Sequence, residues 1–151
     1  MDQEQKVIIY TDGGCKPNPG AGGWAALLIY GDTQKPLYGY DMQTTNNRME
    51  LTAAVRALAA LTRPCAVEFH TDSQYMRNGI TSWIGKWRQN GWRTANKKPV
   101  ENQDLWMQLY DMTQQHTIDW KWVRGHAGNQ YNERVDQLAT RAREQRISSE
   151  A

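Results

Sequence analysis

The sequence is poor in cysteine and has no long apolar run, and each absence restricts the class of protein. It contains two cysteines in 151 residues, which favours a reduced cytoplasmic protein over a secreted domain held by disulfides. No apolar segment approaches the roughly 20 residues that a membrane-spanning helix needs. The first residues, MDQEQKVIIY, lack the basic and apolar parts of a secretory signal. We therefore expect a cytoplasmic protein outside the membrane.

Acidic residues are missing from one long segment. Between Ser73 and Val100 there is neither Asp nor Glu, although six of the 18 Lys and Arg residues fall there. The net charge of the whole chain is only +2, so the remainder of the chain is acidic on balance. A basic segment on an acidic body indicates that one face of the protein binds a polyanion.

Chain length and hydrophobic periodicity predict a single α/β domain over residues 1–151, with a short flexible tail, ISSEA. The stretch GGCKPNPGAGG is interpreted as a turn-rich connection between the first two strands. Three consecutive strands suggest an antiparallel meander, and the element order predicts a mixed sheet with helices packed on its faces. The predicted strands are 6–11, 24–30, 35–42, 66–71 and 117–123. The predicted helices are 47–61, 73–88 with a break near Gly79, 102–115 and about 132–145, with 91–100 irregular.

Four acidic residues lie at or near the ends of these elements: Asp12, Glu50, Asp72 and Asp136. Each has a purely structural explanation. Asp12 begins an Asp-Gly turn dipeptide, and Glu50 can close a capping box at the start of its helix. Asp72 can cap the helix that follows it, and Asp136 can be the solvated flank of an apolar helix face. Taken singly, each of these structural explanations is favoured.

Taken together, the four carboxylates suggest a metal site. If strands 6–11 and 66–71 are neighbours, Asp12 and Asp72 come within a few ångström, and Glu50 and Asp136 can point into the same cleft. Like charges at that range repel strongly, so a stable cluster would hold hard divalent cations such as Mg²⁺ or Mn²⁺. Two ions ~3.5–4 Å apart stabilise the attacking and leaving oxygens of an in-line phosphoryl displacement.

A single histidine, His126, lies in the loop RGHAGNQ. Most loop histidines are simply exposed to solvent. Beside a metal cluster, however, an imidazole can carry protons to or from the attacking water or the leaving 3′-oxygen. Both interpretations of His126 remain open from the residues alone.

The chain contains four separated motifs, YTDGGCKPNPGAGGW, TTNNRMELTAAVRAL, FHTDSQYMRNGI and VRGHAGNQYNERVDQLA. Together they resemble those of bacterial type 1 ribonuclease H, and the resemblance covers a core of about residues 6–143. It implies the ribonuclease H-like α/β fold, a five-stranded mixed sheet of order 3-2-1-4-5 with helices on both faces. It implies an endonuclease that hydrolyses the RNA strand of RNA–DNA hybrids with two Mg²⁺ ions, for which Mn²⁺ is a possible substitute, leaving 5′-phosphate and 3′-hydroxyl ends. It also implies a monomer with no obligate protein partner.

The resemblance also assigns roles to residues. Asp12, Glu50, Asp72 and Asp136 match the family's metal-binding carboxylates, and His126 matches its catalytic histidine. The acid-free segment looks like the family's basic protrusion, which binds the DNA strand. In this segment Trp83 matches an aromatic residue that packs on a deoxyribose in the family. The other residues that match the protrusion are Lys86, Trp87, Arg88, Trp92, Arg93, Lys97 and Lys98.

Further matches concern the recognition of the hybrid. In the family, the minor-groove positions donate to 2′-hydroxyls and base edges, which is how a protein distinguishes RNA from DNA. Thr45 matches part of a DNA-phosphate pocket, and Asn132 matches a position beside the catalytic loop that helps to place the scissile region. The minor-groove matches are Cys15, Asn18, Asn46 and Gln74.

Two departures and two alternatives accompany this interpretation. Gly14 stands where many relatives have Ser, and Lys86 stands where an amide is often found, so phosphate binding there gains charge but loses amide geometry. The first alternative is a catalytically silent hybrid-binding module, which the presence of all four carboxylates disfavours. The second is a DNA-cutting enzyme on the same fold, since a fold does not fix a function.

Overall fold

The computed structural model describes residues 6–123 and 129–149. His126 therefore lies outside the described residues. Within these two segments, no helix is long and apolar enough to cross a membrane.

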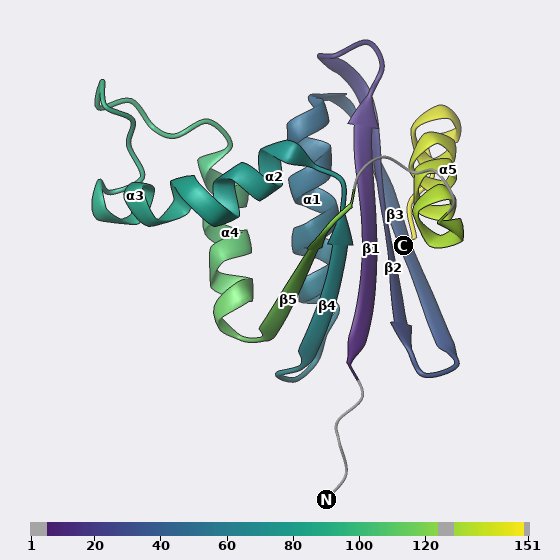
Figure 1. Ribbon diagram of the computed structural model, residues 1–151. Coiled ribbons are helices and arrows are strands. Elements are labelled where there is room, and N and C mark those ends of the chain that lie inside the picture. Colours follow the sequence, from purple (N-terminus) through teal and green to yellow (C-terminus); the bar gives the residue numbers. More distant parts are fainter. Residues whose placement is uncertain (1–5, 124–128, 150–151) are drawn as a thin grey trace, which may run out of the picture.

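A five-stranded sheet forms the centre of the molecule, in the order β3-β2-β1-β4-β5 (Figure 1). The central strand β1 (Val7–Cys15) pairs antiparallel with β2 (Gly20–Tyr30), which pairs antiparallel with β3 (Thr33–Thr44). On its other side β1 pairs parallel with β4 (Ala66–Thr71), and β4 pairs parallel with β5 (Thr117–Trp122). The expected mixed sheet, its strand order and the initial meander are confirmed.

Helices cover both faces of this sheet (Figure 1). One face packs against α1 (Asn46–Ala59) and α4 (Gln103–Gln114), and the other packs against α5 (Gln130–Gln145). Between β4 and α4 the chain forms a protrusion that extends away from the sheet. The protrusion consists of α2 (Gln74–Asn78), a π-helical turn η1 (Gly79–Trp83), α3 (Ile84–Gln89) and the segment that follows.

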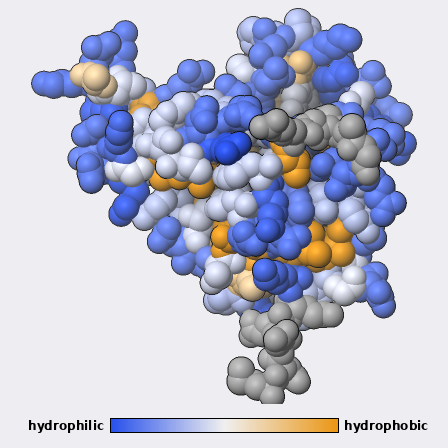
Figure 2. All heavy atoms as spheres, viewed as in Figure 1, coloured by the Kyte–Doolittle hydropathy of each residue, from blue (hydrophilic) through white to orange (hydrophobic). Residues whose placement is uncertain are grey.

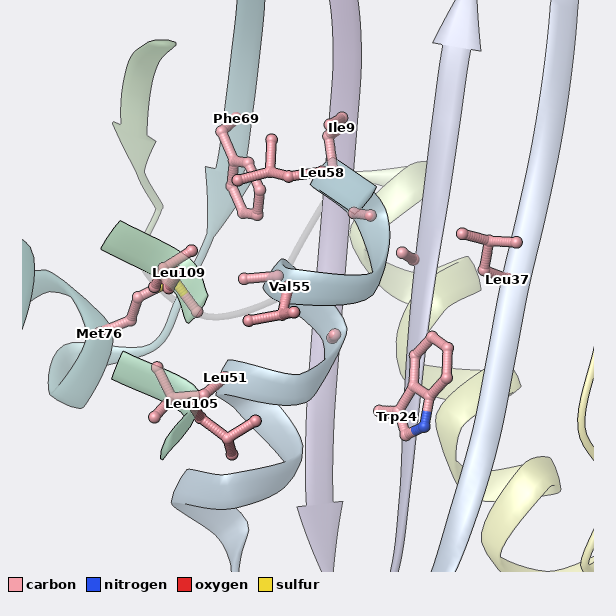
Figure 3. Close-up of a cluster of buried hydrophobic side chains, with 14 of the residues drawn as sticks. Ile9, Trp24, Leu37, Leu51, Val55, Leu58, Phe69, Met76, Leu105 and Leu109 are labelled. Carbon is pink, nitrogen blue, oxygen red and sulfur yellow. The ribbon is translucent and has the colours of Figure 1, made fainter. Parts of the chain in front are cut away.

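Alternation along β1 separates two apolar cores. Ile9 points toward α1 and packs with Leu58 and Phe69 in the larger core (Figure 3). Tyr10 points to the opposite face and packs with Val135 of α5 in the smaller core. Because successive side chains of a strand face opposite sides, Asp12 lies on the same face as Tyr10. The strand thus directs one carboxylate toward α5.

The first two strands extend further than expected. β1 continues to Cys15 and β2 begins at Gly20, and the ladder pairs Gly13 with Trp24 and Gly14 with Gly23. The prediction of a turn-rich stretch over all of GGCKPNPGAGG is therefore wrong, because only residues 16–19 form the connection. These glycines serve close packing instead. A Cβ at Gly13 would lie 2.5 Å from the carbonyl carbon of Met49 in α1.

The predicted helix break near Gly79 is confirmed by the π-helical turn η1. A Cβ at Gly79 would lie 2.0 Å from the Trp106 ring, so only glycine lets this turn pack on α4. The segment 91–100 is irregular, as expected, with an isolated bridge between Arg93 and Pro99.

The tail ISSEA contacts the sheet at Ser149, and the flexibility expected of it stays a prediction. The Ser149 hydroxyl accepts a hydrogen bond from the Tyr38 N–H at 2.9 Å, and the Ser149 N–H donates to the Tyr38 carbonyl at 2.9 Å. These bonds attach residues after α5 to β3.

Candidate active site

Asp12 and Asp72 lie side by side because of the strand pairing. β1 and β4 run parallel, with Tyr10 opposite His70. Asp12 lies two residues after Tyr10, and Asp72 lies two residues after His70. The hypothesis that the two strands are neighbours is confirmed. Both carboxylates therefore lie at the same edge of the sheet, where parallel strands end.

Glu50 joins them from α1. The helix can approach β1 closely because Gly13 has no side chain: a Cβ there would lie 2.8 Å from the Glu50 nitrogen. Asp12, Glu50 and Asp72 each offer a carboxylate oxygen, and these oxygens lie within 4.8 Å of one another. Asp12 is 9% exposed and Glu50 is 8% exposed, so two of the three acidic residues are largely buried from solvent.

Asp136 completes the group from the opposite face of the sheet. It lies on the exposed side of α5 and lines the same cleft as the other three carboxylates. Gly23 permits this arrangement, because a Cβ there would lie 2.2 Å from the Ala139 carbonyl oxygen of α5. The structure thus brings together all four acidic residues that the sequence singled out.

The purely structural explanations of three acids are wrong. The cap of α1 is Thr45, whose hydroxyl accepts from the Arg48 N–H at 3.2 Å, so Glu50 does not close a capping box. The cap of α2 is Ser73, whose hydroxyl accepts from the Met76 N–H at 3.0 Å, so Asp72 is not the cap. Asp12 lies within a strand rather than in a turn.

The cluster is electrostatically unfavourable without a cation. Burial, the hydrogen bond to Asp136 and the negative charge of Asp72 raise the pKa of Asp12 to about 8. Burial and the charges of Asp12 and Asp72 raise the pKa of Glu50 well above its usual range. Glu50 Oε1 is also buried without a hydrogen-bond partner among the described residues. A hard divalent cation fits this donor set, because it would satisfy that oxygen and offset the repulsion.

A cleft of about 460 Å³ opens in front of the carboxylates. A smaller pocket of about 210 Å³ adjoins it and shares Asp12, Asn46 and Asp136 with it. A third pocket, of about 350 Å³, lies beside Val7 and Ala66, which begin β1 and β4, and so lies away from the acidic cluster. Several lining residues of the cleft were not predicted, namely Gly13, Asn47, Ser73 and Tyr75.

Of the predicted minor-groove residues, Asn46 and Gln74 line this cleft and Cys15 lines the smaller pocket beside it. The Asn46 carboxamide oxygen accepts from the Cys15 N–H at 2.7 Å, and the Asn18 carboxamide oxygen accepts from the Asn46 N–H at 3.2 Å. Since both oxygens accept bonds within the protein, the amide nitrogens are the ends that can donate to a ligand. Gln74 begins α2, is exposed and lines the cleft.

Two other predicted residues lie in less open positions. Thr45 uses its hydroxyl to cap α1, so any phosphate contact would share that group. Asn132 is 5% exposed, and its N–H donates to the Asn129 side chain at the start of α5. Asn132 lies four residues after segment 124–128 in the chain, and the role expected of it beside the catalytic loop stays a prediction.

The protrusion carries the predicted basic residues on an aromatic support. Trp87 lies between Trp83 and Trp106, with ring centroids 5.6 Å and 5.4 Å away, and Trp92 lies 6.2 Å from it. Lys86, Arg93, Lys97 and Lys98 are exposed, and Figure 2 shows this lobe as mainly hydrophilic.

Two arginines make contacts that the sequence did not indicate. The Arg88 guanidinium lies 4.5 Å from the centre of the Tyr110 ring of α4, so this side chain reaches back toward the body. Arg48 forms a bidentate pair with Asp104 at 2.9 and 3.0 Å and also donates to Asn102. The latter contacts link the start of α1 to the start of α4.

Comparison with known proteins gives one consistent family. The family model described as RNase H matches residues 4–144. The chain is 62% identical to a ribonuclease H of Granulibacter bethesdensis over 144 residues, which cover 95% of this chain and 96% of that protein. It is 61% identical to a ribonuclease H of Rhodopseudomonas palustris over 133 residues, covering 88% and 89% of the two chains.

Solved structures agree with this result. The crystal structure of LC9-RNase H1, described as a type 1 RNase H with the type 2 active-site motif, superposes with a TM-score of 0.85 at 29% identity. The match covers 99% of this chain and 77% of that one. LC11-RNase H1, solved in complex with an RNA/DNA hybrid, shares the fold with a TM-score of 0.70 at 22% identity, over 93% of this chain and 98% of that one.

Proposed function

Because the chain belongs to the ribonuclease H family, we propose that it is an endonuclease that hydrolyses the RNA strand of RNA–DNA hybrids and leaves 5′-phosphate and 3′-hydroxyl ends. The observation that carries this proposal is the convergence of Asp12, Glu50 and Asp72, whose oxygens lie within 4.8 Å of one another in an open cleft. The proposal includes a single domain over residues 1–151 that acts as a monomer.

The cofactor in this proposal is Mg²⁺, with two ions present during catalysis and Mn²⁺ as a possible substitute. Asp12, Glu50, Asp72 and Asp136 would hold the ions. When bound, such ions stabilise the attacking and leaving oxygens of phosphodiester hydrolysis. Two observations support this assignment: Glu50 Oε1 is buried without a partner among the described residues, and the pKa of Asp12 is raised. A bound cation would relieve both conditions.

The protein residues bind the hybrid and place its RNA strand over the carboxylates. In this proposal Cys15, Asn18, Asn46 and Gln74 contact the minor groove and recognise 2′-hydroxyls. Asn132 helps to place the scissile region. His126 moves protons to or from the reacting oxygens.

The basic protrusion would bind the DNA strand. Exposed cations on a rigid aromatic support suit phosphate contacts, because the support fixes their position at little entropic cost. Trp83, half-buried against Tyr75 with ring centroids 5.8 Å apart, would pack on a deoxyribose. The other proposed contacts in this region are Thr45, Lys86, Trp87, Arg88, Arg93, Lys97 and Lys98.

Charge-neutral substitutions test the assignment of the carboxylates. Asp12→Asn and Asp72→Asn should abolish cleavage of a labelled hybrid while the hybrid still shifts on a native gel. Asp119→Asn is the matched control, because that carboxylate lies on the edge strand β5 beside Lys121 and should leave cleavage unchanged. His126→Ala should slow the reaction by roughly 10²–10⁴-fold, as for a single general acid or base. Full turnover in both site variants would contradict the proposal.

A further inference from the structure

The smaller pocket beside the acidic cleft differs from the cleft in charge. This pocket, of about 210 Å³, lies between the end of β1 and the outer half of α5. It shares Asp12 and Asp136 with the cleft, whereas Lys16 and Arg143 line the pocket and not the cleft. Positive charge that continues from a cation-binding cluster favours an anionic ligand.

Glycines on two neighbouring strands form the floor of this pocket. Gly14 of β1 pairs with Gly23 of β2, and both line the pocket. A Cβ at Gly14 would have one neighbour within 4 Å among the described residues outside its own segment, Asn46 Oδ1 at 3.4 Å. The space above Gly14 is therefore open, and a ligand can approach the strand closely there.

The packing of α5 directs Arg143 toward this floor. A Cβ at Gly23 would lie 2.9 Å from the Arg143 nitrogen and 3.0 Å from the Arg143 Cβ, so the residue begins against the sheet. Its side chain is 21% exposed. The guanidinium lies 3.8 Å from Glu144 Oε2, which is longer than a hydrogen bond, so Glu144 does not occupy its N–H donors.

Arg143 continues the face of α5 that carries Asp136. The two residues are about two helical turns apart, or roughly 10 Å along the axis, and Ala139 and Thr140 lie between them on the pocket side. A nucleic-acid strand carries a phosphate about every 3.4 Å of helix axis. A strand held at the carboxylates therefore reaches Arg143 within a few nucleotides.

Backbone donors at the edge of the pocket are already in use. The Cys15 N–H donates to the Asn46 side chain at 2.7 Å, and the Lys16 N–H donates to the Ala21 carbonyl at 2.9 Å. Side chains must therefore supply the donors for an anion. Lys16 and Thr140 are exposed, and with Arg143 they offer an ammonium, a hydroxyl and a guanidinium, the groups by which proteins bind nucleic-acid phosphates.

We propose that Arg143, with Lys16 and Thr140, forms a subsite for a phosphate of the RNA strand a few nucleotides from the bond that is cut. The RNA strand is the one that reaches this side, because the protrusion proposed for the DNA strand lies across the sheet from α5 (Figure 1). The planar guanidinium can hold two phosphate oxygens with parallel N–H donors. The three residues bind and place the strand and take no part in the chemistry. The inference rests on the proposed function, in which the RNA strand lies over the carboxylates.

The test compares Arg143→Gln with Arg141→Gln. Arg141 is exposed on the same helix but lines a separate pocket with Pro36 and Leu138 that contains none of the four carboxylates. Affinity for a labelled RNA–DNA hybrid is measured with each change in the Asp72→Asn background, in which the hybrid is expected to bind without being cut.

Arg143→Gln should raise the Kd for the hybrid roughly tenfold, as for the loss of one hydrogen bond between charged groups. It should also reduce the slope of log K against log salt by about 0.9. Arg143→Lys should keep that slope but lose part of the affinity, because an ammonium keeps the charge without the fork of donors. Arg141→Gln should leave both quantities at the background values.

Replacing single phosphates with uncharged methylphosphonates identifies the strand. One replacement in the RNA strand, within a few nucleotides of the cut, should weaken binding and should have no further effect once Arg143 is replaced by Gln. An unchanged Kd in Arg143→Gln, additive losses at every phosphate, or coupling to a phosphate of the DNA strand instead would overturn the inference. Because binding is read without cleavage, such a failure is distinguishable from a failure of the native protein to cut hybrids.

Discussion

Asp12 on β1 and Asp136 on α5 line the same cleft, and the negative charge of Asp136 adds to the burial that raises the pKa of Asp12. The same buried surroundings raise the pKa of Asp12 and of Glu50. The acidic cluster is thus arranged for a bound cation rather than for the stability of the metal-free chain.

The first prediction concerns the stability of the metal-free protein as a function of pH. The pKa of Asp12 rises from 3.8 to about 8 on folding, so the folded state binds a proton that the unfolded state releases. Its stabilising contribution is complete below about pH 4 and is lost as the pH rises through about 8. The free energy of unfolding, measured by urea denaturation in EDTA, should fall across this window.

Comparison with the Asp12→Asn variant separates the contribution of Asp12 to stability from the contributions of the other ionisable groups. The variant cannot ionise at this position, so its free energy of unfolding should exceed that of the native protein increasingly toward the upper end of the window. The pKa of Glu50 is raised as well, so its ionisation should make the free energy of unfolding of the native protein fall more steeply with pH. A constant difference between variant and native protein from about pH 4 to about pH 8 would contradict the account.

The second prediction is that Mg²⁺ stabilises the fold through this cluster. A ligand that binds only the folded state at 100 times its Kd adds about 2.7 kcal/mol to the free energy of unfolding. Glu50→Gln should remove most of the increase in Tm, because it takes one ligand from the group. Asp119→Asn, an exposed carboxylate on β5, should keep it. Equal increases in Tm for both variants would place the ion elsewhere.

The third prediction concerns the close packing of β1 against α1. In Gly13→Ala the new Cβ would lie 2.5 Å from the Met49 carbonyl carbon, so α1 must move away from the strand. The expected loss is about 1–3 kcal/mol, as for other overpacked positions, and activity should fall further because Glu50 moves with the helix. Chemical denaturation and cleavage assays measure the two effects.

Gly85 supplies the control for this substitution. It lies in α3, where a Cβ would have no neighbouring atom within 4 Å among the described residues, so Gly85→Ala should stabilise the protein by roughly 0.5–1 kcal/mol. If Gly13→Ala matched the native protein in stability and activity, the close approach of α1 would not be what positions Glu50.

The fourth prediction concerns the basic protrusion. Replacing Arg93, Lys97 and Lys98 with Gln should raise KM for the hybrid and flatten its salt dependence. Each lost phosphate contact should reduce the slope of log K against log salt by about 0.9. Steady-state kinetics over a range of salt concentrations measures both quantities.

Two basic residues at the other end of the sheet provide the control for this prediction. Lys35 and Arg63 line the pocket beside Val7 and Ala66, away from the carboxylates. Replacing them with Gln should leave both KM and its salt slope unchanged. If the protrusion variant had the native slope, the protrusion would not contact the nucleic acid.

Much of the fold could be predicted from local sequence. The strand 66–71 and the break at Gly79 follow from alternation and from a glycine within an otherwise helical pattern, and both agree with the structure. The ends of β1 and β2 could not be predicted in the same way. Glycine in a turn and glycine under a closely packed helix look alike in sequence, and only the contact of Gly13 with Met49 distinguishes them.

The four carboxylates could be selected from the sequence, but their convergence depends on the pairing of β1 with β4, which local patterns do not determine. The resemblance to ribonuclease H implied that pairing, and the register of Tyr10 with His70 confirms it. The packing of the Tyr10 ring against Tyr131 could not be predicted, because it joins distant segments through side chains that are common in strands and helices.

The most direct test of the central claim is cleavage of one labelled RNA, presented as an RNA–DNA hybrid, as an RNA duplex and as a single strand, with Mg²⁺ or with EDTA. We expect internal cuts in the hybrid alone, and only when metal is present. A hybrid that shifts on a native gel but is never cut, or equal cutting of all three forms, would contradict the account.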